Sequence, residues 1–454
     1  MRIPLRFITT PVLASALFFG ACATRREAFD KAFEAGRLEK AENISQTAIT
    51  KSRPDALEWL LRAADSAHFA GKLNDAVATY ARACELFHLR DSENQALMRD
   101  PARMEASLLK NSGENSYFAR TYERIFAETR RGEALLESGD PRAARKAFAA
   151  AEAWRENAMK RIPLETSGRS RALDALLARD APAAGDHAPY FAATRFCEQY
   201  VKDPAFDAYG SHANPYSTYI SAIVALLDGD AASAEAGLKA AAVMLQRNQQ
   251  VINEANWFGP SPKHPEAANR VWVIIENGLQ PRLREVRVES RQDLPTPTGT
   301  ISTKLHLALP VLEVIDSPYT GFRVNSSGRK EPLYSEVLAN VDAIARAEYN
   351  QALPDLTKHE TVRALIRASA SASPNTTAPK VPFPAANTRQ WSTLPKNIHL
   401  LTFNMPADRT FTLSSTHGAR SLPVTIPPCK NAIILFRVPG TLSDAPPPRV
   451  LTFN

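Results

Sequence analysis

Four glycines in the first half of the chain are each followed by the same spacing of side-chain sizes. Small residues stand five and twelve positions after each glycine, and in three cases a bulky residue stands nine positions after it. The glycines are Gly36, Gly71, Gly139 and Gly229. Small side chains let a second helix approach closely, while a bulky one fills the groove between the two helices. The spacing therefore predicts pairs of packed helices, each joined at one of these glycines.

This spacing resembles the second helix of a tetratricopeptide repeat. The first two glycines lie 35 residues apart and the next two 68, close to one and two repeats of about 34. The last two lie 90 apart, and we attribute the excess to an interruption at Ser170–Asp203. The alternative is an irregular bundle of alanine-rich helices. A repeat array would present a concave surface to a partner protein or peptide. The predicted packing residues are Ala41, Ala48, Ala76, Tyr80, Ala83, Ala144, Phe148, Ala151, Ala234, Leu238 and Ala241.

The composition changes after residue 270. Before it, Ala, Leu, Glu and Arg dominate and favour helices; after it lie 20 of the 33 prolines, together with alternating β-branched runs. Such runs between turn residues predict strands. The predicted strands are Val271–Glu276, Arg284–Glu289, Ile301–Leu309, Phe322–Val324, Ile398–Phe403, Thr410–Leu413, Leu422–Ile426, Ala432–Val438 and Val450–Phe453. We expect a β-rich, sandwich-like C-terminal domain.

Two helices are expected inside this β-rich part, over Ser335–Leu353 and Asp355–Ala370. Pro354 is predicted to separate them because its ring cannot continue a helix. The fold class is therefore an α+β multidomain protein. Its predicted parts are a signal peptide at 1–21, a tetratricopeptide-like helical domain at 22–258, a linker at 259–270, strands with the inserted helical pair at 271–370, a second linker at 371–387, and a β-rich end at 388–454.

The N-terminus carries the pattern of an export signal. Arg2 and Arg6 precede a short apolar run, and Gly20-Ala21-Cys22 follows it. A basic start, a short apolar core and a small-residue exit are typical of secretory signals. The last three residues resemble a bacterial lipobox, which implies that Cys22 carries a lipid; plain secretion is the alternative. Ala23 is not the aspartate of an inner-membrane retention signal, which favours the outer membrane, facing the periplasm.

Charge and cysteine content limit the other possibilities. Residues 271–454 hold 20 cations and 14 anions, without a Lys/Arg cluster. This surplus is too dilute to indicate nucleic acid. A Cys84–Cys197 disulfide is possible after export, although the spacing does not require it, and buried free cysteines are the preferred alternative. No later segment has the apolar length of a membrane helix, so attachment to a membrane is expected through the N-terminal lipid.

The sequence contains no motif with a catalytic or metal-binding mechanism. There is no His-Glu-x-x-His, Cys-x-x-Cys, Gly-x-Ser-x-Gly or phosphate-binding loop. We therefore predict no enzyme, no cofactor, no metal and no small-molecule substrate. The candidate contacts to a partner are aromatic and cationic residues, each with packing as its alternative: Tyr117, Tyr122, Tyr216, Arg389 and Trp391.

Several segments together resemble a bacterial family of exported lipoproteins with tetratricopeptide-like helices, a β-rich C-terminus and uncharacterised activity. The segments that carry the resemblance are Tyr117–Ala151, Asn214–Asp230, Val271–Pro281, Asn340–Ala345 and Thr388–Pro395. The resemblance implies an envelope lipoprotein that acts as a protein-binding scaffold or adaptor. The alternative function is a cell-wall or carbohydrate-binding module that uses the basic β-rich domain.

Overall fold

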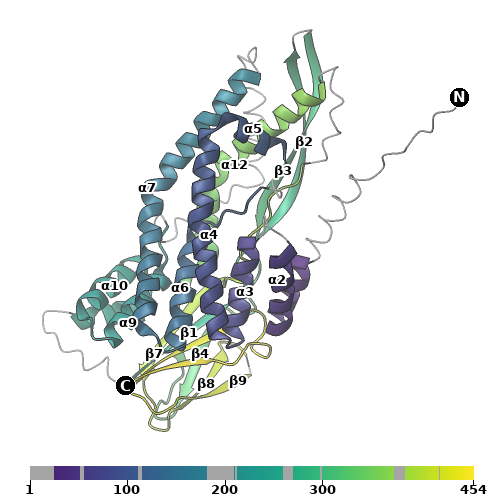
Figure 1. Ribbon diagram of the computed structural model, residues 1–454. Helices are drawn as coiled ribbons and strands as arrows, with labels where there is room; N and C mark the ends of the chain where they lie inside the picture. Colours follow the sequence, from purple (N-terminus) through teal and green to yellow (C-terminus); the bar gives the residue numbers. More distant parts are fainter. Residues whose placement is uncertain are drawn as a thin grey trace.

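The computed structural model describes residues 25–51, 56–110, 115–180, 209, 212–258, 269–296, 299–372, 384–418 and 420–454. It is a mixed α+β protein, with most helices in the N-terminal part and the sheets in the C-terminal part (Figure 1). The predicted signal peptide and Cys22, the Cys197 thiol and most of both predicted linkers lie outside the described residues. No helix in the described ranges is long and apolar enough to cross a membrane.

Four helical hairpins form the N-terminal part. Each consists of a first helix, a short turn and a second helix that packs against the first. The pairs are residues 25–34 with α2 (Leu38–Lys51), α3 (Ala56–Phe69) with α4 (Leu73–Arg99), α6 (Thr121–Glu137) with α7 (Pro141–Asp180), and α9 (Pro215–Leu227) with α10 (Ala231–Met244). The shorter helices are α5 (Pro101–Leu109), α11 (Gln249–Ala255) and η2 (Asn256–Phe258).

The same backbone turn closes all four hairpins. Gly36, Gly71, Gly139 and Gly229 have φ between +65° and +85°. In each turn the glycine N–H donates to the carbonyl three residues before it, and the next N–H donates to the carbonyl five residues before its own. This is the Schellman motif, which favours glycine because only glycine adopts the left-handed conformation without strain. The predicted packing residues that follow the four glycines are all buried.

The predicted interruption of the helical region begins later than expected. The α7 helix continues through Ser170 to Asp180, so the first part of the predicted loop is helical. Apart from Asp174, residues 171–179 are all alanine, leucine or arginine, which have high helix propensity. The remainder of the predicted interruption, from 181, lies outside the described residues up to Tyr209.

Three sheets make up the β-rich part within the described residues. A five-stranded sheet has the order β11 (Arg449–Phe453), β10 (Asn431–Val438), β1 (Arg270–Asn277), β7 (Asn397–Asn404) and β6 (Glu336–Asn340). A four-stranded sheet has the order β5 (Leu333–Tyr334), β4 (Phe322–Ser326), β8 (Thr410–Ser415) and β9 (Ser421–Thr425). The strands β2 (Arg282–Thr296) and β3 (Gly299–Glu313) form a long hairpin.

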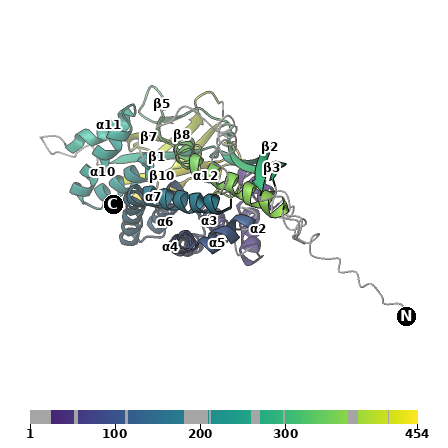
Figure 2. The ribbon, with the colours of Figure 1, turned by 90° about the horizontal axis from the view of Figure 1, so that it is seen from above.

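The five-stranded sheet is covered on both faces. On β1, Trp272 and Ile274 join the apolar core shared with the helices, whereas Val271, Val273 and Ile275 join a core shared with the four-stranded sheet. Successive strand residues point to opposite faces, so both sets are buried at once. This double burial explains why β1 is a continuous apolar run. Figure 2 shows the helices and the strands as adjacent layers.

The predicted division of the β-rich part at 371–387 does not separate two sheets. Within the five-stranded sheet, β1 and β6 precede that segment and β7, β10 and β11 follow it. The two predicted parts therefore fold together. They also share one continuous apolar core with the helical region, because the sheet needs a helical layer to cover its second face.

The prediction of two helices separated by Pro354 was wrong. Residues 336–340 form β6, and one helix, α12 (Val341–Ala372), continues through Pro354. Tyr349 and Leu353 pack on β2 and β3 before the proline, and Ala364 packs on β3 after it. Because both halves are held by the same hairpin, tertiary packing outweighs the local cost of the proline. The hairpin and α12 extend away from the sheets together with α5 and the end of α7 (Figure 1).

Candidate functional site: an ionic network between the helices and the sheet

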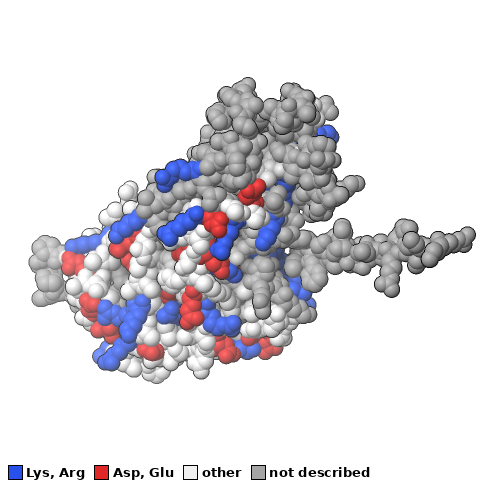
Figure 3. Space-filling view, turned by 45° about the horizontal axis from the view of Figure 1, so that its top comes forward, with Lys and Arg blue, Asp and Glu red and all other residues white. Residues whose placement is uncertain are grey.

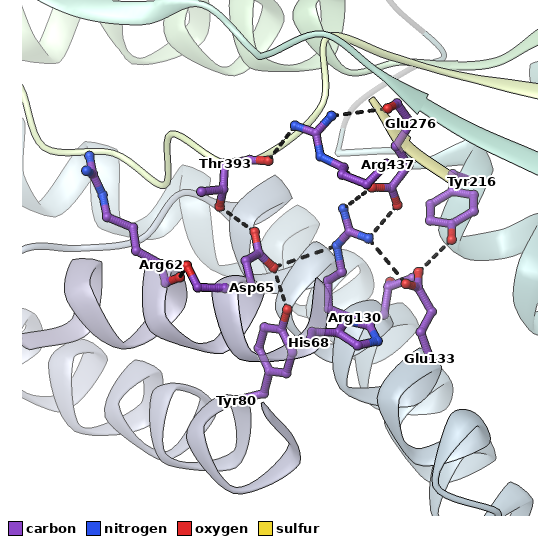
Figure 4. Close-up of polar contacts among 12 residues, drawn as sticks. Arg62, Asp65, His68, Tyr80, Arg130, Glu133, Tyr216, Glu276, Thr393 and Arg437 are labelled. Atoms are coloured by element: carbon purple, nitrogen blue, oxygen red, sulfur yellow. Dashed lines mark hydrogen bonds and ion pairs between the residues drawn. The ribbon is translucent and has the colours of Figure 1, made fainter. Parts of the chain in front are cut away.

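Two neighbouring strands of the five-stranded sheet carry opposite charges at the same register position. Glu276 of β1 pairs with Arg437 of the parallel strand β10. Arg130 of α6 reaches the same carboxylate from the helical layer (Figure 4). Its Nη2 donates to Oε2 of Glu276 at 2.6 Å, and its Nη1 donates to Oε1. These two parallel hydrogen bonds form the bidentate geometry that gives Arg–carboxylate pairs their strength.

Arg437 on β10 forms hydrogen bonds both to the end of β1 and to the loop before β7. Its Nη1 donates to the carbonyl of Gly278 at 2.8 Å and to that of Glu276 at 3.1 Å, and its Nη2 donates to the carbonyl of Thr393 at 2.9 Å. Its Nε lies 3.7 Å from the Glu276 carboxylate. Burial lowers the pKa of Arg437 to about 10, so the guanidinium stays protonated at neutral pH.

Asp65 of α3 faces Arg130 from the opposite side. Its Oδ1 accepts a hydrogen bond from the Tyr80 hydroxyl of α4, and its Oδ2 accepts one from the Thr393 hydroxyl. Arg130 Nε lies 3.9 Å from Asp65 Oδ1. Burial raises the pKa of Asp65. Asp65 thus connects two helices and the loop before β7 through one carboxylate.

Glu133 completes the central cluster. It lies one helical turn after Arg130, accepts from Arg130 Nη1 at 3.2 Å, and accepts from the Tyr216 hydroxyl of α9 at 2.5 Å. Burial raises the pKa of Glu133. Burial also acts to raise the pKa of Glu276, but the charge and hydrogen bonds of Arg130 outweigh it and hold that pKa below its ordinary value.

The charges of the central cluster do not cancel when every group is ionised. Asp65, Glu133 and Glu276 face Arg130 and Arg437. The Arg449 guanidinium lies 3.8 Å from the Glu133 carboxylate but also pairs with Glu137, so one excess negative charge remains. The five side chains of the central cluster are at most 2% exposed, and unbalanced charge is costly in such a region. One proton held by the carboxyl groups neutralises the cluster. The raised pKa values of Asp65 and Glu133 fit this balance.

A second ionic group extends the network to the edge strand. Glu137 of α6 accepts from Arg449 Nη1 of β11 at 2.6 Å and lies 2.8 Å from Nε2 of His68 on α3. Burial lowers the pKa of His68 to about 4, so the imidazole is neutral at pH 7. Arg449 therefore supplies the positive charge that balances Glu137.

The geometry gives the network a structural role. A reacting molecule has no access to side chains that are almost completely buried, whereas ionic contacts between layers fix the orientation of the layers. Three of the first helices, α3, α6 and α9, are buried over most of their length and share an apolar core with the sheet; α3 is buried from Leu57 to Phe69. The second helices are more exposed, and α10 buries only Ala234, Leu238 and Ala241. The inner side of the helical layer is therefore occupied by the chain's own sheet.

The three tyrosines predicted as partner contacts lie in the interior. The Tyr117 hydroxyl donates to the Glu123 carboxylate at 2.6 and 2.7 Å, and the Tyr122 hydroxyl donates to Gln280 at 3.0 Å. The Tyr216 hydroxyl donates a hydrogen bond to Glu133 of the network. At most 4% of each tyrosine is exposed. They are packing residues in this structure, which was the stated alternative.

The other two predicted contacts are also buried. The Trp391 side chain is fully buried and its backbone N–H donates to Glu123 Oε1 at 2.9 Å. Arg389 is 4% exposed and its Nη2 donates to the carbonyl of Asn115 at 2.6 Å. We therefore do not assign these residues to a surface that meets a partner. Cys84 and Cys429 are buried free thiols. Buried free cysteines were the alternative that we preferred to a disulfide.

Sequence reasoning did not identify the network itself. A signal was present in the two central strands, because Glu276 and Arg437 are each a lone charged residue near the end of an apolar run. A charged residue in a buried strand requires a partner of opposite sign. The three helical members, Asp65, Arg130 and Glu133, lie on helices that carry other charged residues, and they give no comparable signal.

A separate cavity of about 690 Å³ is lined by α4, α5, α12 and the segment before α6. Its walls carry both signs of charge together with apolar side chains. In the ranges that the structure describes, no group of three or more His, Cys, Asp or Glu residues is placed to hold a metal ion.

The fold and network define a mixed α+β protein in which a layer of helical hairpins covers one face of a sheet and buried ion pairs join α6 to the strands β1 and β11. Comparisons with protein-family models, with curated proteins and with solved structures gave no significant match.

Proposed function

We propose that the chain is a non-catalytic lipoprotein of the bacterial envelope that acts as a protein-binding scaffold. The N-terminal pattern ending in Cys22 supports export and lipid attachment. More than one acyl chain would hold the protein durably at a membrane. The outer membrane, with the protein facing the periplasm, is the proposed location. The family resemblance of the sequence remains part of this proposal.

We also propose that the helical hairpins are tetratricopeptide-like. Support comes from the shared turn and from close helix contacts within the hairpins. A Cβ added at Gly132 would lie 2.7 Å from the Phe148 ring, and one added at Gly237 would lie 2.7 Å from the Ala222 Cβ. Small residues at such crossings are what repeat helices use to approach each other. We propose in addition that the β-rich part is sandwich-like, since an apolar core lies between the five-stranded and the four-stranded sheets.

The observation that carries the proposal is the difference between the two helices of each hairpin. The first helices α3, α6 and α9 are buried over most of their length and share an apolar core with the sheet, whereas the described parts of the second helices alternate buried and exposed residues. Among the described side chains, three of the second helices each expose a large apolar one: Leu89 on α4 at 51%, Met159 on α7 at 52% and Val243 on α10 at 71%. We therefore place the partner on the outer side of the helical layer, because its inner side is filled.

Photo-crosslinking in cells tests this assignment. A photoreactive amino acid replaces Leu89, Met159 or Val243 in the full chain. Matched controls carry it at Tyr334 and Val337, which are 51% and 41% exposed on the strand side. We expect a discrete protein adduct from the helical positions and none from the controls. Adducts from the strand positions alone would contradict the proposal.

The alternative is a wall-binding module that uses the basic β-rich part. Figure 3 shows cationic and anionic side chains interspersed on one face of the molecule, with the helical layer in front of the strands. Co-sedimentation of the full chain with purified peptidoglycan separates the two functions. Salt-sensitive sedimentation together with the absence of helical-face adducts would favour the alternative.

A further inference from the structure

The cavity described above is bounded by one continuous face of α12. The residues that line it from this helix recur at spacings of three or four, which places them on one side. Its other walls are α4, α5 and the segment before α6. A volume of about 690 Å³ falls within the range of small-molecule sites, about 300–1,000 Å³. The α12 residues include Glu348, Ala352, Asp355, His359 and Arg363.

Most of the charges that line the cavity are already paired. Paired side chains are satisfied within the protein and define the walls. The pairs are Arg124 with Asp91 at 2.7 Å, Arg363 with Glu360 at 2.8 Å, Arg90 with Glu93 at 2.6 Å, and Glu348 with the backbone N–H groups of Thr121 and Tyr122 at 3.0 and 2.8 Å.

Two half-buried groups of opposite charge, Arg120 and Asp355, differ from these wall residues because they have no partner of opposite charge in an ion pair among the described residues. The Arg120 guanidinium lies over the ring of Tyr349, 5.4 Å from its centroid, and its charge attracts the buried Glu123 carboxylate; among the described residues no side chain forms a hydrogen bond or ion pair with this guanidinium. The Asp355 carboxylate on α12 likewise has no partner in the described part of the chain. Both are held partly out of water. Stacking on the ring already restricts the conformations of the guanidinium. Binding of an anion therefore costs less side-chain entropy.

We propose that this cavity binds a short zwitterionic peptide, with the peptide carboxylate on Arg120 and its ammonium group on Asp355. Phe118, Met104 and Leu356 line the cavity and supply apolar contact for small side chains. A polyanion would meet the carboxylates of Asp355 and the wall pairs. A neutral sugar would leave both charged groups without partners. The proposal goes beyond the scaffold function and depends on neither the lipid nor the protein partner.

Calorimetric titration of the purified full chain with trialanine tests the proposal. Trialanine has both charged ends and side chains small enough for the cavity. C-terminally amidated and N-acetylated trialanine each lack one charge. We expect each modification to weaken binding about tenfold, which corresponds to about 1.4 kcal/mol. The Arg120→Gln and Asp355→Asn variants are expected to weaken the binding of trialanine by similar factors.

The pairing of charges is tested by combining variants and ligands. Arg120→Gln should leave the affinity for the amidated peptide unchanged, because both changes remove the same contact. Asp355→Asn should leave the affinity for the acetylated peptide unchanged, and Arg120→Lys should restore part of the loss. Arg329→Gln and Asp316→Asn are matched controls at exposed positions outside the cavity, and they should have no effect.

The opposite results overturn the proposal. These are no binding heat at about 10 mM trialanine, where even a Kd near 1 mM would saturate the site, or equal affinities for the charged and blocked peptides. If the Arg120→Gln chain does not fold, as judged by circular dichroism, comparison of the three peptides on the unchanged chain still decides the question.

Discussion

Removal of Arg130 is the sharpest test of the ionic network. Arg130→Met keeps a long side chain of similar reach but leaves Glu276, Glu133 and Asp65 without their shared cation. Arg130 makes two hydrogen bonds to Glu276 and one to Glu133. Breaking a buried ion pair by removing one partner costs about 3–5 kcal/mol. We expect a loss of that size, which is a large part of the roughly 5–15 kcal/mol that stabilises a typical protein.

Urea unfolding of the full chain, followed by circular dichroism and tryptophan fluorescence, measures this loss. Trp272 and Trp391 are buried in the core that the helices share with the sheet, so their fluorescence contributes a signal from that interface. Arg130→Lys retains the charge but cannot form the bidentate contact, and we expect a smaller loss. In the double variant with Glu276→Gln, the two losses should be less than additive by about 2 kcal/mol, because the glutamine side chain no longer carries the charge that the loss of Arg130 leaves without its bidentate partner.

A loss below about 1 kcal/mol for Arg130→Met would refute this reasoning. It would mean that water or a shift of the helices satisfies the three carboxyl groups. Full additivity of the Arg130 and Glu276 changes would likewise show that the two side chains are not energetically coupled.

Three further predictions concern Glu254, Gly237 and Cys22. Burial raises the pKa of Glu254 to about 7 from 4.5; the folded state therefore binds this proton more tightly than the unfolded state, and stability should fall by on the order of 3 kcal/mol as the pH rises through that interval. Urea midpoints between about pH 5 and pH 8 should show this loss in the unchanged chain, and a correspondingly smaller slope in Glu254→Gln. Gly237→Ala should lower stability by about 1–3 kcal/mol, despite the higher helix propensity of alanine, because the new Cβ would meet the Ala222 Cβ at 2.7 Å; adding Ala222→Gly should recover part of the loss, and a stabilised Gly237→Ala chain would contradict the close crossing. Cys22→Ser should abolish incorporation of radiolabelled palmitate and release the chain from the membrane fraction, whereas continued labelling would exclude Cys22 as the attachment site.

The local elements were largely predictable from the sequence. The turns at Gly36, Gly71, Gly139 and Gly229 were identified because a left-handed backbone conformation selects glycine within a few residues of chain. The strands of the β-rich part were found because alternation and β-branched content act locally. Pro354 shows the limit of such reasoning, since α12 continues through it while packed on β2 and β3.

The site depended on contacts that local patterns do not contain. Tyr117, Tyr216 and Trp391 were singled out for their chemistry, but their burial depends on how the helical layer lies on the sheet. The cavity was not foreseen because Arg120 and Asp355 are more than 230 residues apart and come together only in the folded chain.

The sequence by itself determined the helical hairpins, their turns and the positions of most strands, because each of these depends on backbone preferences and side-chain periodicity within one short segment. Only the tertiary structure decided that β1 lies parallel to β10, that Glu276 therefore meets Arg437, and that Arg130 reaches both from the helical layer. The physical reason is that an ion pair between distant segments has no local signature: its energy arises only when both charges leave water together.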